Sequence, residues 1–451
     1  MAHALDRHLV LVGFMGAGKS TVGAQAAARL QRPFLDVDGE VEATHGPIWE
    51  LFAKEGEAAF RELEARFLRE ACARGEPSVI AVGGGAVETR GLLGELDVLA
   101  VLLDVDVETA WQRVGGSPRP LAQDEDEFRR RFERRQPLYD EVADAHATDT
   151  DDTVLAAAGI EFGPYREVLG EGAVVADGRV ADLYEIDVVH VVEAKAIAEA
   201  ERAWSELTLD RSSTLVAVGG GTTTDLVGFV AATYMRGIDW IAVPSTLVGQ
   251  VDAAIGGKTG VDLAEGKNLV GAFHWPVATR IDTALLETLP DEERLNGLAE
   301  VVKTGLLAGE PYWELETEAQ VRACAAYKAA VCLRDPREQG ERAHLNLGHT
   351  FGHALETASG NTIPHGRAVA LGLLAALRLS GLEEQARTVE EVLAPEPVAV
   401  DREVAWELLQ RDKKAREGRV RLVLLDAPGA PRLTADVEPE RVRAALDALI
   451  A

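Results

Sequence analysis

Short apolar runs alternate with helically spaced segments over the first 160 residues of the chain. Residues 8–14 form an apolar run that reaches a glycine, and residues 20–30 follow with the spacing of an amphipathic helix. Similar apolar runs recur at residues 78–82 and 98–103. Strands that alternate with helices build a parallel sheet with helices on both faces. The pattern therefore predicts an α/β fold for this part of the chain.

A domain boundary is expected near residue 160. Residues 144–152 are acidic and threonine-rich with little apolar content, and a turn-like Phe-Gly-Pro follows soon afterwards. Beyond it come a β-rich stretch, a helix over residues 194–207, and strands over residues 214–218 and 240–243. This second alternation predicts another α/β domain.

The last third of the chain reads as mostly helical. Residues 286–415 consist of Ala-, Leu- and Glu-rich periodic segments, and residues 421–425 form one late apolar run that we read as a strand. The three expected domains span residues 1–159, 160–285 and 286–451.

Composition narrows the class of protein. The chain has 451 residues, too many for one ordinary core, and its 47% hydrophobic and 27% charged residues are typical of a soluble globular protein. No apolar run approaches the roughly 20 residues that a membrane span needs. The N-terminus shows no signal-peptide core, and the three cysteines include no CxxC pair. We expect a cytoplasmic location.

The formal net charge of −29 bears on the partners of the protein. Such a field repels polyanions, which disfavours nucleic acid and anionic membranes as partners. The acidity is most simply a solubility or salt-adaptation property. Small-molecule substrates are the expected partners, and places where lysines and arginines gather become informative.

A phosphate-loop motif occupies residues 13–20, with the sequence GFMGAGKS. In this motif, placed between a strand and a helix, backbone N–H groups and the helix N-terminus surround a β-phosphate. Lys19 would reach the β- and γ-phosphates, Ser20 would bind Mg²⁺, and ATP is the expected donor. The residues expected to bind the nucleotide are Gly16, Ala17, Gly18, Lys19, Ser20 and Thr21.

Smaller signals in the same region concern the acceptor of the phosphoryl group. Two carboxylates, Asp36 and Asp38, follow an apolar pair, and Gly83, Gly84 and Gly85 end a strand. Arginines stand in FRELE, RPL and RQPLY at positions 61, 119 and 135. Each signal alone fits a turn or a solvated helix face. Together, over roughly residues 5 to 150, they resemble shikimate kinase, with a related small-molecule or nucleoside monophosphate kinase as the second interpretation.

The resemblance implies roles for these residues. Asp38, Arg61, the backbone of residues 83–85 and Arg135 would hold shikimate, with the guanidinium groups gripping its carboxylate. Asp36 would orient Mg²⁺ through water, and Asp38 would contact the attacking hydroxyl. Arg119 matches the mobile lid of the family and would stabilise charge on the transferred group. Arg113, just before the lid, matches a position that stacks on adenine.

A second constellation begins at the triple glycine of residues 219–221. The sequence GGGTTTD follows a predicted strand and opens a helix, so it is a plausible dinucleotide site, although it is not the GxGxxG fingerprint. Further on, Glu300 and a group of histidines, His349, His353 and His365, suit Zn²⁺. Spacing alone favours His349 and His353, four residues apart on one helix face, as the ligand pair.

From about residue 193 to the C-terminus the chain resembles 3-dehydroquinate synthase. The resemblance replaces the spacing argument: it makes Glu300, His349 and His365 the ligands of Zn²⁺, with Co²⁺ as a possible substitute, and turns His353 toward the substrate. The implied NAD⁺ contacts are Gly221, Thr222, Thr223, Thr224, Asp225, Ser245, Thr246, Lys258 and Lys267. The implied substrate contacts are Asp252, Lys258, Asn268, Lys303, Lys328, Arg342, Asn346 and Lys413. The groups expected to act in catalysis are Lys19, Asp38 and Arg119 in the kinase and Lys258, Lys303, Arg342 and His353 in the synthase. Arg236 matches a residue that reaches the substrate phosphate across a dimer interface, which implies a homodimer.

The chain departs from the synthase pattern in one region. The family has a longer α/β section before the triple glycine and a GExxK motif that contacts the nucleotide, whereas this chain has only Glu193 and Lys195 in a shortened stretch. The expected protein is a bifunctional enzyme, a shikimate kinase fused to 3-dehydroquinate synthase, that serves aromatic amino acid synthesis. The alternatives are a kinase fused to another sugar phosphate cyclase or to a metal-dependent alcohol dehydrogenase, and a regulatory protein that only senses nucleotides.

Overall fold

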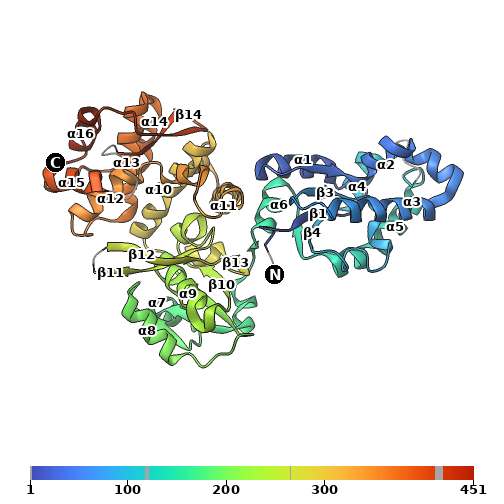
Figure 1. The fold of residues 1–451 in the computed structure, drawn as a ribbon, viewed down its shortest axis with the longest axis horizontal. Coiled ribbons are helices and arrows are strands. Elements are labelled where there is room, and N and C mark those ends of the chain that lie inside the picture. Colours follow the sequence, from blue (N-terminus) through green and yellow to red (C-terminus); the bar gives the residue numbers. More distant parts are fainter. Residues whose placement is uncertain (1–2, 117–120, 265, 412–419) are drawn as a thin grey trace. The chain divides into compact units, whose positions relative to one another are not determined.

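A computed structural model describes residues 3–116, 121–264, 266–411 and 420–451 (Figure 1). The chain divides into two compact units, residues up to Glu161 and residues from Phe162 onward. Among the described residues, no helix combines the length and the apolar character needed to cross a membrane.

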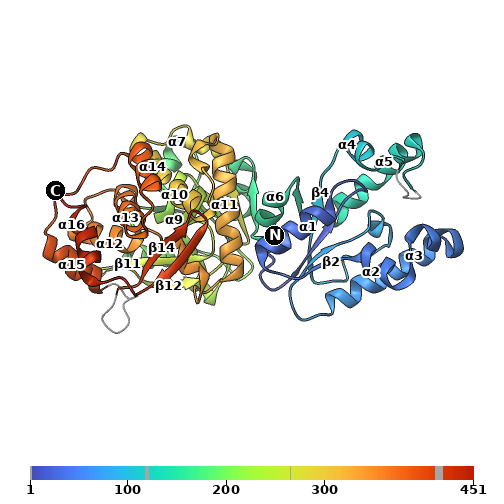
Figure 2. The ribbon, with the colours of Figure 1, turned by 90° about the horizontal axis from the view of Figure 1, so that it is seen from above.

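The first unit is built on a parallel sheet of five strands in the order β2-β3-β1-β4-β5. The strands are β1 (His8–Val12), β2 (Phe34–Asp36), β3 (Val79–Ala81), β4 (Val98–Leu103) and β5 (Ala145–Ala147). The helices around it are α1 (Lys19–Leu30), α2 (Val37–His45), α3 (Ile48–Cys72), α4 (Val107–Val114), α5 (Glu125–Val142) and α6 (Thr150–Ala157) (Figure 2). Every residue of β1 and β4 is buried, which explains their continuous apolar runs. At its carboxyl end β1 leads into the phosphate loop, β2 ends at Asp36, and β3 leads to the glycines at 83–85.

The second unit begins with a six-stranded sheet in the order β6-β13-β10-β9-β7-β8. Its strands are β6 (Ile160–Phe162), β7 (Ala173–Asp177), β8 (His190–Val192), β9 (Thr214–Gly219), β10 (Asp239–Pro244) and β13 (Ala278–Ile281). The helices of this region are α7 (Gly178–Tyr184), α8 (Ile197–Glu206) and α9 (Gly221–Thr233). An antiparallel hairpin of β11 (Lys258–Leu263) and β12 (Gly266–Phe273) lies outside this sheet and contacts α9.

The remainder of the second unit is helical. Its helices are α10 (Asp291–Ala308), α11 (Thr317–Arg334), α12 (His349–Ala358), α13 (His365–Ser380), α14 (Glu383–Leu393), α15 (Arg402–Arg411) and α16 (Pro439–Asp447). The buried helix α13 packs against α10, α12 and α14, and one hydrophobic core joins these helices to the strand β14 (Leu422–Ala427). A partner strand, β15 (Ala430–Thr434), completes a small antiparallel sheet.

The predicted fold class is confirmed: a parallel sheet with helices around it, then a second α/β region, then a mostly helical part. The helix predicted over residues 194–207 begins only at Ile197, because Ala196 has an extended backbone. The hairpin β11–β12 was not predicted. Most of β12 is exposed, so it lacks the alternation of apolar and polar positions that marks a half-buried strand.

Candidate active sites

The phosphate loop connects β1 to α1 through glycines with backbone angles that other residues rarely adopt. Gly16 and Gly18 have φ of 85° and 98°. A Cβ on Gly16 would also lie 2.7 Å from the carbonyl oxygen of Ala110. The helix α1 begins at Lys19, so its first N–H groups are available to an anion at this end of the loop.

Polar side chains of the loop contact one another and the loop backbone. Lys19 Nζ donates to the carbonyl oxygens of Gly13 (2.7 Å) and Phe14 (3.1 Å). Ser20 Oγ donates to Asp36 Oδ2 at 2.5 Å, so the two predicted Mg²⁺ residues are neighbours. Arg113 donates to the carbonyl oxygen of Gly16 at 2.9 Å and so lies against the loop.

A cavity of about 260 Å³ lies beside the loop. Its polar lining includes all the residues that the sequence assigns to the acceptor within the described part of the chain, Asp38, Arg61, Gly83, Gly84, Gly85 and Arg135. Its apolar wall consists of Met15, Ile48, Trp49, Phe52, Phe60 and Leu121. Arg119 lies outside the described residues.

Three carboxylates that the sequence reasoning missed contact the two cavity arginines. Arg61 donates to Glu64 (2.8 Å) and Glu57 (2.9 Å), and Arg135 donates to Glu88 (2.8 Å). None of the three glutamates lines the cavity, so they hold the arginines from outside it. Burial raises the pKa of Glu64, which outweighs the opposing effect of Arg61. The spacing of Glu57 and Glu64, four residues before and three after Arg61 on one helix, is the signal that could have found them.

Arg135 has bonding capacity that no described residue uses. Only 1% of the side chain is exposed, and its Nε and Nη1 atoms are buried without a hydrogen-bond partner among the described residues. A buried guanidinium with two idle donors on a cavity wall is suited to an anionic ligand such as a carboxylate.

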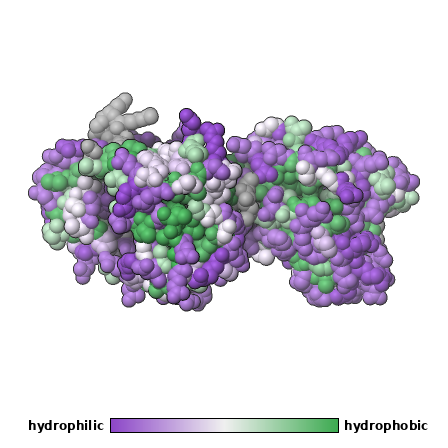
Figure 3. Space-filling model, turned by 90° about the horizontal axis from the view of Figure 1, so that it is seen from below, coloured by the Kyte–Doolittle hydropathy of each residue, from purple (hydrophilic) through white to green (hydrophobic). Residues whose placement is uncertain are grey.

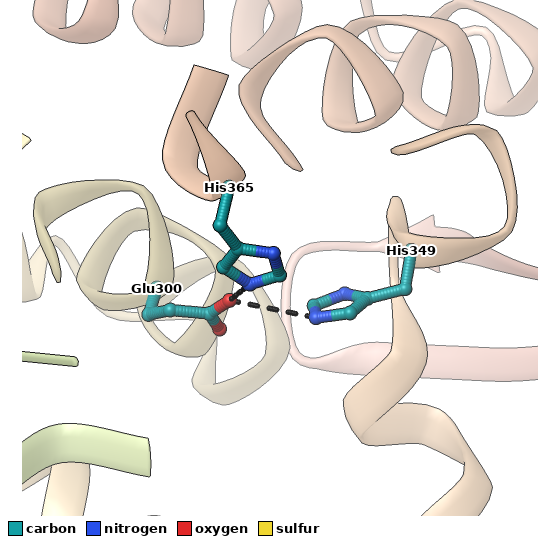
Figure 4. A group of neighbouring side chains, drawn as sticks. All are labelled: Glu300, His349 and His365. Carbon is teal, nitrogen blue, oxygen red and sulfur yellow. Dashed lines mark hydrogen bonds and ion pairs between the residues drawn. The ribbon is translucent and has the colours of Figure 1, made fainter. Parts of the chain in front are cut away.

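In the second unit, Glu300, His349 and His365 come together from three different helices (Figure 4). One ligand atom of each lies within 4.8 Å of the others. Glu300 Oε1 is 3.0 Å from His365 Nε2 and 3.4 Å from His349 Nε2. Burial alone would raise the pKa of Glu300, but Lys303 and the two histidines hold it well below its usual range. The pKa of His365 rises to about 10, because Glu300 and Glu356 outweigh the opposing effect of burial.

The two imidazoles are oriented by their second nitrogens. His349 Nδ1 is 3.1 Å from the carbonyl oxygen of Leu347, and His365 Nδ1 is 3.4 Å from Glu356 Oε1. Both rings therefore turn Nε2 toward Glu300, which is the arrangement of a metal site with two histidines and one carboxylate. These donors fit Zn²⁺ or Co²⁺. His353 is exposed and outside this group, with its ring centroid 5.4 Å from that of His349, so the pair suggested by spacing alone is not the one that the structure assembles.

A chain of buried and half-buried charges leads away from this group. Lys303 Nζ is 2.5 Å from Glu300 and 3.5 Å from Asp252, and Lys328 Nζ is 2.8 Å from Asp252. Asp252 lies in a short π-helical turn, Gly249–Ala253, a geometry that is frequent at functional sites. Four of the residues predicted from the sequence are thus connected in one network.

Two further predicted substrate residues share a contact with one glutamate, and a third bonds to the backbone just before the hairpin. Lys258 on β11 pairs with Glu338, and the same glutamate accepts from Asn346 Nδ2 at 3.0 Å. Arg342 is 2% exposed and donates to the carbonyl oxygen of Gly256 at 2.8 Å. Glu338 is a site residue that sequence reasoning missed. Lys413 lies outside the described residues.

The candidate nucleotide site lies where β9 ends and α9 begins. Gly220 caps the helix, and Thr222, Thr223, Thr224 and Asp225 occupy its first turns. A Cβ on Gly220 would be 3.0 Å from Thr246, so the turn after β10, which also carries Ser245, lies beside it. Lys195 is 2.5 Å from Asp225 and from Asn268 Oδ1. Lys195, which stands where the family has its GExxK motif, thus contacts two predicted site residues. Arg236, by contrast, lies on an exposed turn between α9 and β10.

Together these features define a phosphate-loop kinase unit joined to an α/β unit with a nucleotide-binding turn and a metal site. Family comparisons agree with both parts. The family described as shikimate kinase matches residues 15–161, and those described as the N-terminal and C-terminal domains of 3-dehydroquinate synthase match residues 187–296 and 297–415. The chain belongs to the shikimate kinase family in its first part and to the 3-dehydroquinate synthase family in its second.

Individual relatives are similar to the second part. The 3-dehydroquinate synthase of Symbiobacterium thermophilum is 42% identical over 285 residues, covering 57% of this chain and 80% of the relative. That of Pseudomonas putida is 42% identical over 320 residues, covering 61% of this chain and 87% of the relative. A solved structure of the 2-epi-5-epi-valiolone synthase of Streptomyces hygroscopicus, with NAD⁺ and Zn²⁺ bound, is 25% identical with a TM-score of 0.55, covering 64% of this chain and 96% of that one.

Proposed function

We propose that the chain catalyses two reactions of the shikimate pathway. The first is the ATP-dependent phosphorylation of shikimate to shikimate 3-phosphate, and the second converts 3-deoxy-D-arabino-heptulosonate 7-phosphate to 3-dehydroquinate and phosphate. Family membership of the two parts supports this assignment. The observation that carries it furthest is the group of Glu300, His349 and His365 and its connection through Lys303 to Asp252. We place both reactions in the cytoplasm.

In the kinase reaction the residues of the first unit divide into three tasks. The N–H groups of the phosphate loop and Lys19 bind the phosphates of ATP, and Ser20 and Asp36 hold Mg²⁺. The two cavity arginines grip the carboxylate of shikimate. Asp38 lines the same cavity and orients the attacking hydroxyl, with Arg113 and Arg119 near the nucleotide as the family resemblance implies.

In the synthase reaction Glu300, His349 and His365 hold Zn²⁺ or Co²⁺, and the turn before α9 holds NAD⁺. When bound, zinc supplies Lewis-acid polarisation and NAD⁺ supplies reversible hydride transfer. Burial would lower the pKa of Lys303, but Asp252 and Glu300 raise it, so this lysine keeps its proton and serves as a hydrogen-bond donor. The other basic side chains, from Lys258 and Lys267 to Lys328 and Arg342, offer charge to the phosphate and carboxylate of the substrate. His353 completes the site on the exposed side of α12.

We further propose a homodimer formed through the second unit, with Arg236 reaching the phosphate in the partner's site. Met235 and Arg236 have φ of 48° and 71° on an exposed turn, and such strain is typical of functional positions. Met235 is 43% exposed, and Leu269 and Phe273 of the hairpin are 41% and 48% exposed. Figure 3 shows hydrophobic residues gathered within a hydrophilic rim on one face of this unit. Sedimentation should give twice the chain mass, and Arg236→Ala should slow phosphate release without changing that mass.

Two assays on the purified chain test the proposed activities. ADP formation is followed with ATP, Mg²⁺ and shikimate, and phosphate release is followed with the heptulosonate phosphate, Zn²⁺ and NAD⁺. Both are expected. Absence of phosphate release would end the synthase assignment, and absence of shikimate-dependent ADP formation would end the kinase assignment.

A further inference from the structure

Glu356 is a buried carboxylate with no role in the proposed reaction so far. It lies on α12, two turns after His349, and only 7% of it is exposed. A carboxylate is rarely buried to this degree unless it is paired. Among the described residues, its side chain contacts His365 Nδ1 at 3.4 Å and Lys267 Nζ at 3.9 Å.

The contact with Glu356 determines which ring nitrogen of His365 points to the metal group. Because Nδ1–H donates to Glu356, the lone pair for a metal is on Nε2, the atom 3.0 Å from Glu300. For His349 the corresponding acceptor is a backbone carbonyl, that of Leu347, which substitution of a side chain cannot remove. His365 depends on a side chain for the same purpose. Its position at the first residue of α13 gives the ring no support from a preceding helical turn.

Lys267 extends this arrangement to the hairpin. It lies on β12 and is 52% exposed, and its ammonium is the second cationic neighbour of the Glu356 carboxylate. The metal group and a strand that carries predicted cofactor and substrate residues therefore share one carboxylate.

We propose that Glu356 is the positioning residue of His365: it fixes the tautomer and ring orientation that let the histidine bind the metal, and it links the metal site to the hairpin. The inference rests on the proposed metal site of the synthase. Residues of this kind typically contribute a factor of about 10 to 100 in metal affinity. The helix end itself does not depend on this side chain, because Ser359 and Asn361 bond to the backbone oxygen of Glu356.

The test is a competition titration of Zn²⁺ against a chromophoric chelator, carried out on the full chain. Glu356→Ala should bind Zn²⁺ about 10- to 100-fold more weakly than wild type, and Glu356→Gln, which keeps an acceptor for Nδ1–H, should lose less. Glu390→Gln is the matched control. Glu390 lies on α14 and forms an ion pair with Arg378, which is on α13, the helix that His365 begins, but 13 residues after that histidine. The control should bind Zn²⁺ like wild type.

The visible spectrum of bound Co²⁺ reports on the geometry of the metal ligands directly. With Co²⁺ in place of Zn²⁺, the visible absorption of Glu356→Ala should change while that of Glu390→Gln should not. Unchanged shikimate phosphorylation reports that each variant is folded in its first unit, and circular dichroism reports on the second. Affinity and spectrum of Glu356→Ala equal to those of wild type would overturn the inference while the proposed function stands. A wild-type chain that binds no Zn²⁺ and releases no phosphate would overturn the proposed synthase function itself.

Discussion

Replacing Arg135 by lysine should weaken the binding of shikimate without slowing the phosphoryl transfer. The side chain is 1% exposed, Nη2 donates to Glu88 at 2.8 Å, and Nε and Nη1 have no hydrogen-bond partner among the described residues. A lysine keeps the charge but has a single nitrogen. It can pair with Glu88 or reach the carboxylate of a ligand, but it cannot do both in the planar fork geometry of a guanidinium.

The expected magnitude follows from one lost charge-assisted hydrogen bond. Such a bond is worth about 1.5–3 kcal/mol, which corresponds to a rise in KM for shikimate of roughly 10- to 150-fold. Binding energy that is equal in the ground state and the transition state changes KM alone, so kcat should remain within about twofold of wild type. The assay is steady-state ADP formation over a range of shikimate concentrations.

Arg131→Lys is the matched control for this prediction. Arg131 is on the same helix one turn earlier, is also buried, and donates to Leu121 O (3.1 Å) and Glu127 (3.0 Å) without lining the cavity. Its KM for shikimate should stay close to that of wild type. A wild-type KM in Arg135→Lys, or an equal rise of KM in both variants, would show that Arg135 does not bind the carboxylate of shikimate.

Three further predictions concern both units. Gly85→Ala should raise KM for shikimate by about tenfold, because its Cβ would lie 2.0 Å from Arg61 Nη2 and displace that guanidinium; a KM near the wild-type value would contradict this. Glu64→Gln should stabilise the first unit at about pH 8 but not at about pH 4. Burial raises the pKa of the Glu64 carboxyl in the folded state, so its ionisation opposes folding only as the pH rises. Thermal denaturation at the two pH values checks it, and an equal gain at both would count against it. A chelator selective for Zn²⁺ over Mg²⁺ should stop phosphate release while leaving ADP formation intact, and phosphate release from a chain shown to hold no metal would disprove the metal's role.

The parts of the fold that the sequence predicted share a physical cause. The strands β1 and β4 are buried along their whole length, so they read as continuous apolar runs, and the glycines of the phosphate loop mark the end of β1. A boundary near residue 160 was expected because the chain there is acidic and poor in apolar residues. The hairpin β11–β12 was missed because the side chains of β12 are mostly exposed and give no periodic signal.

The candidate sites divide in a similar way. Residues in compact motifs, such as the phosphate loop, could be found from spacing, whereas the group of Glu300 and His365 joins positions 65 residues apart that only the fold brings together. Spacing favoured His353, and the resemblance to a family was needed to replace it. Supporting carboxylates such as Glu88 and Glu356 escaped prediction because glutamates are common on helix surfaces, and only burial and a partner distinguish these.

One chain with two independent active sites should respond to a pair of variants, one in each site, by losing one activity at a time. Lys19 bonds to the backbone of Gly13 and Phe14 in the phosphate loop, and His349 belongs to the metal group of the other unit. Each variant is measured for both activities. Lys19→Ala should abolish ADP formation with shikimate and leave phosphate release unchanged, and His349→Ala should do the reverse. Loss of both activities in either folded variant, or loss of neither, would contradict the account.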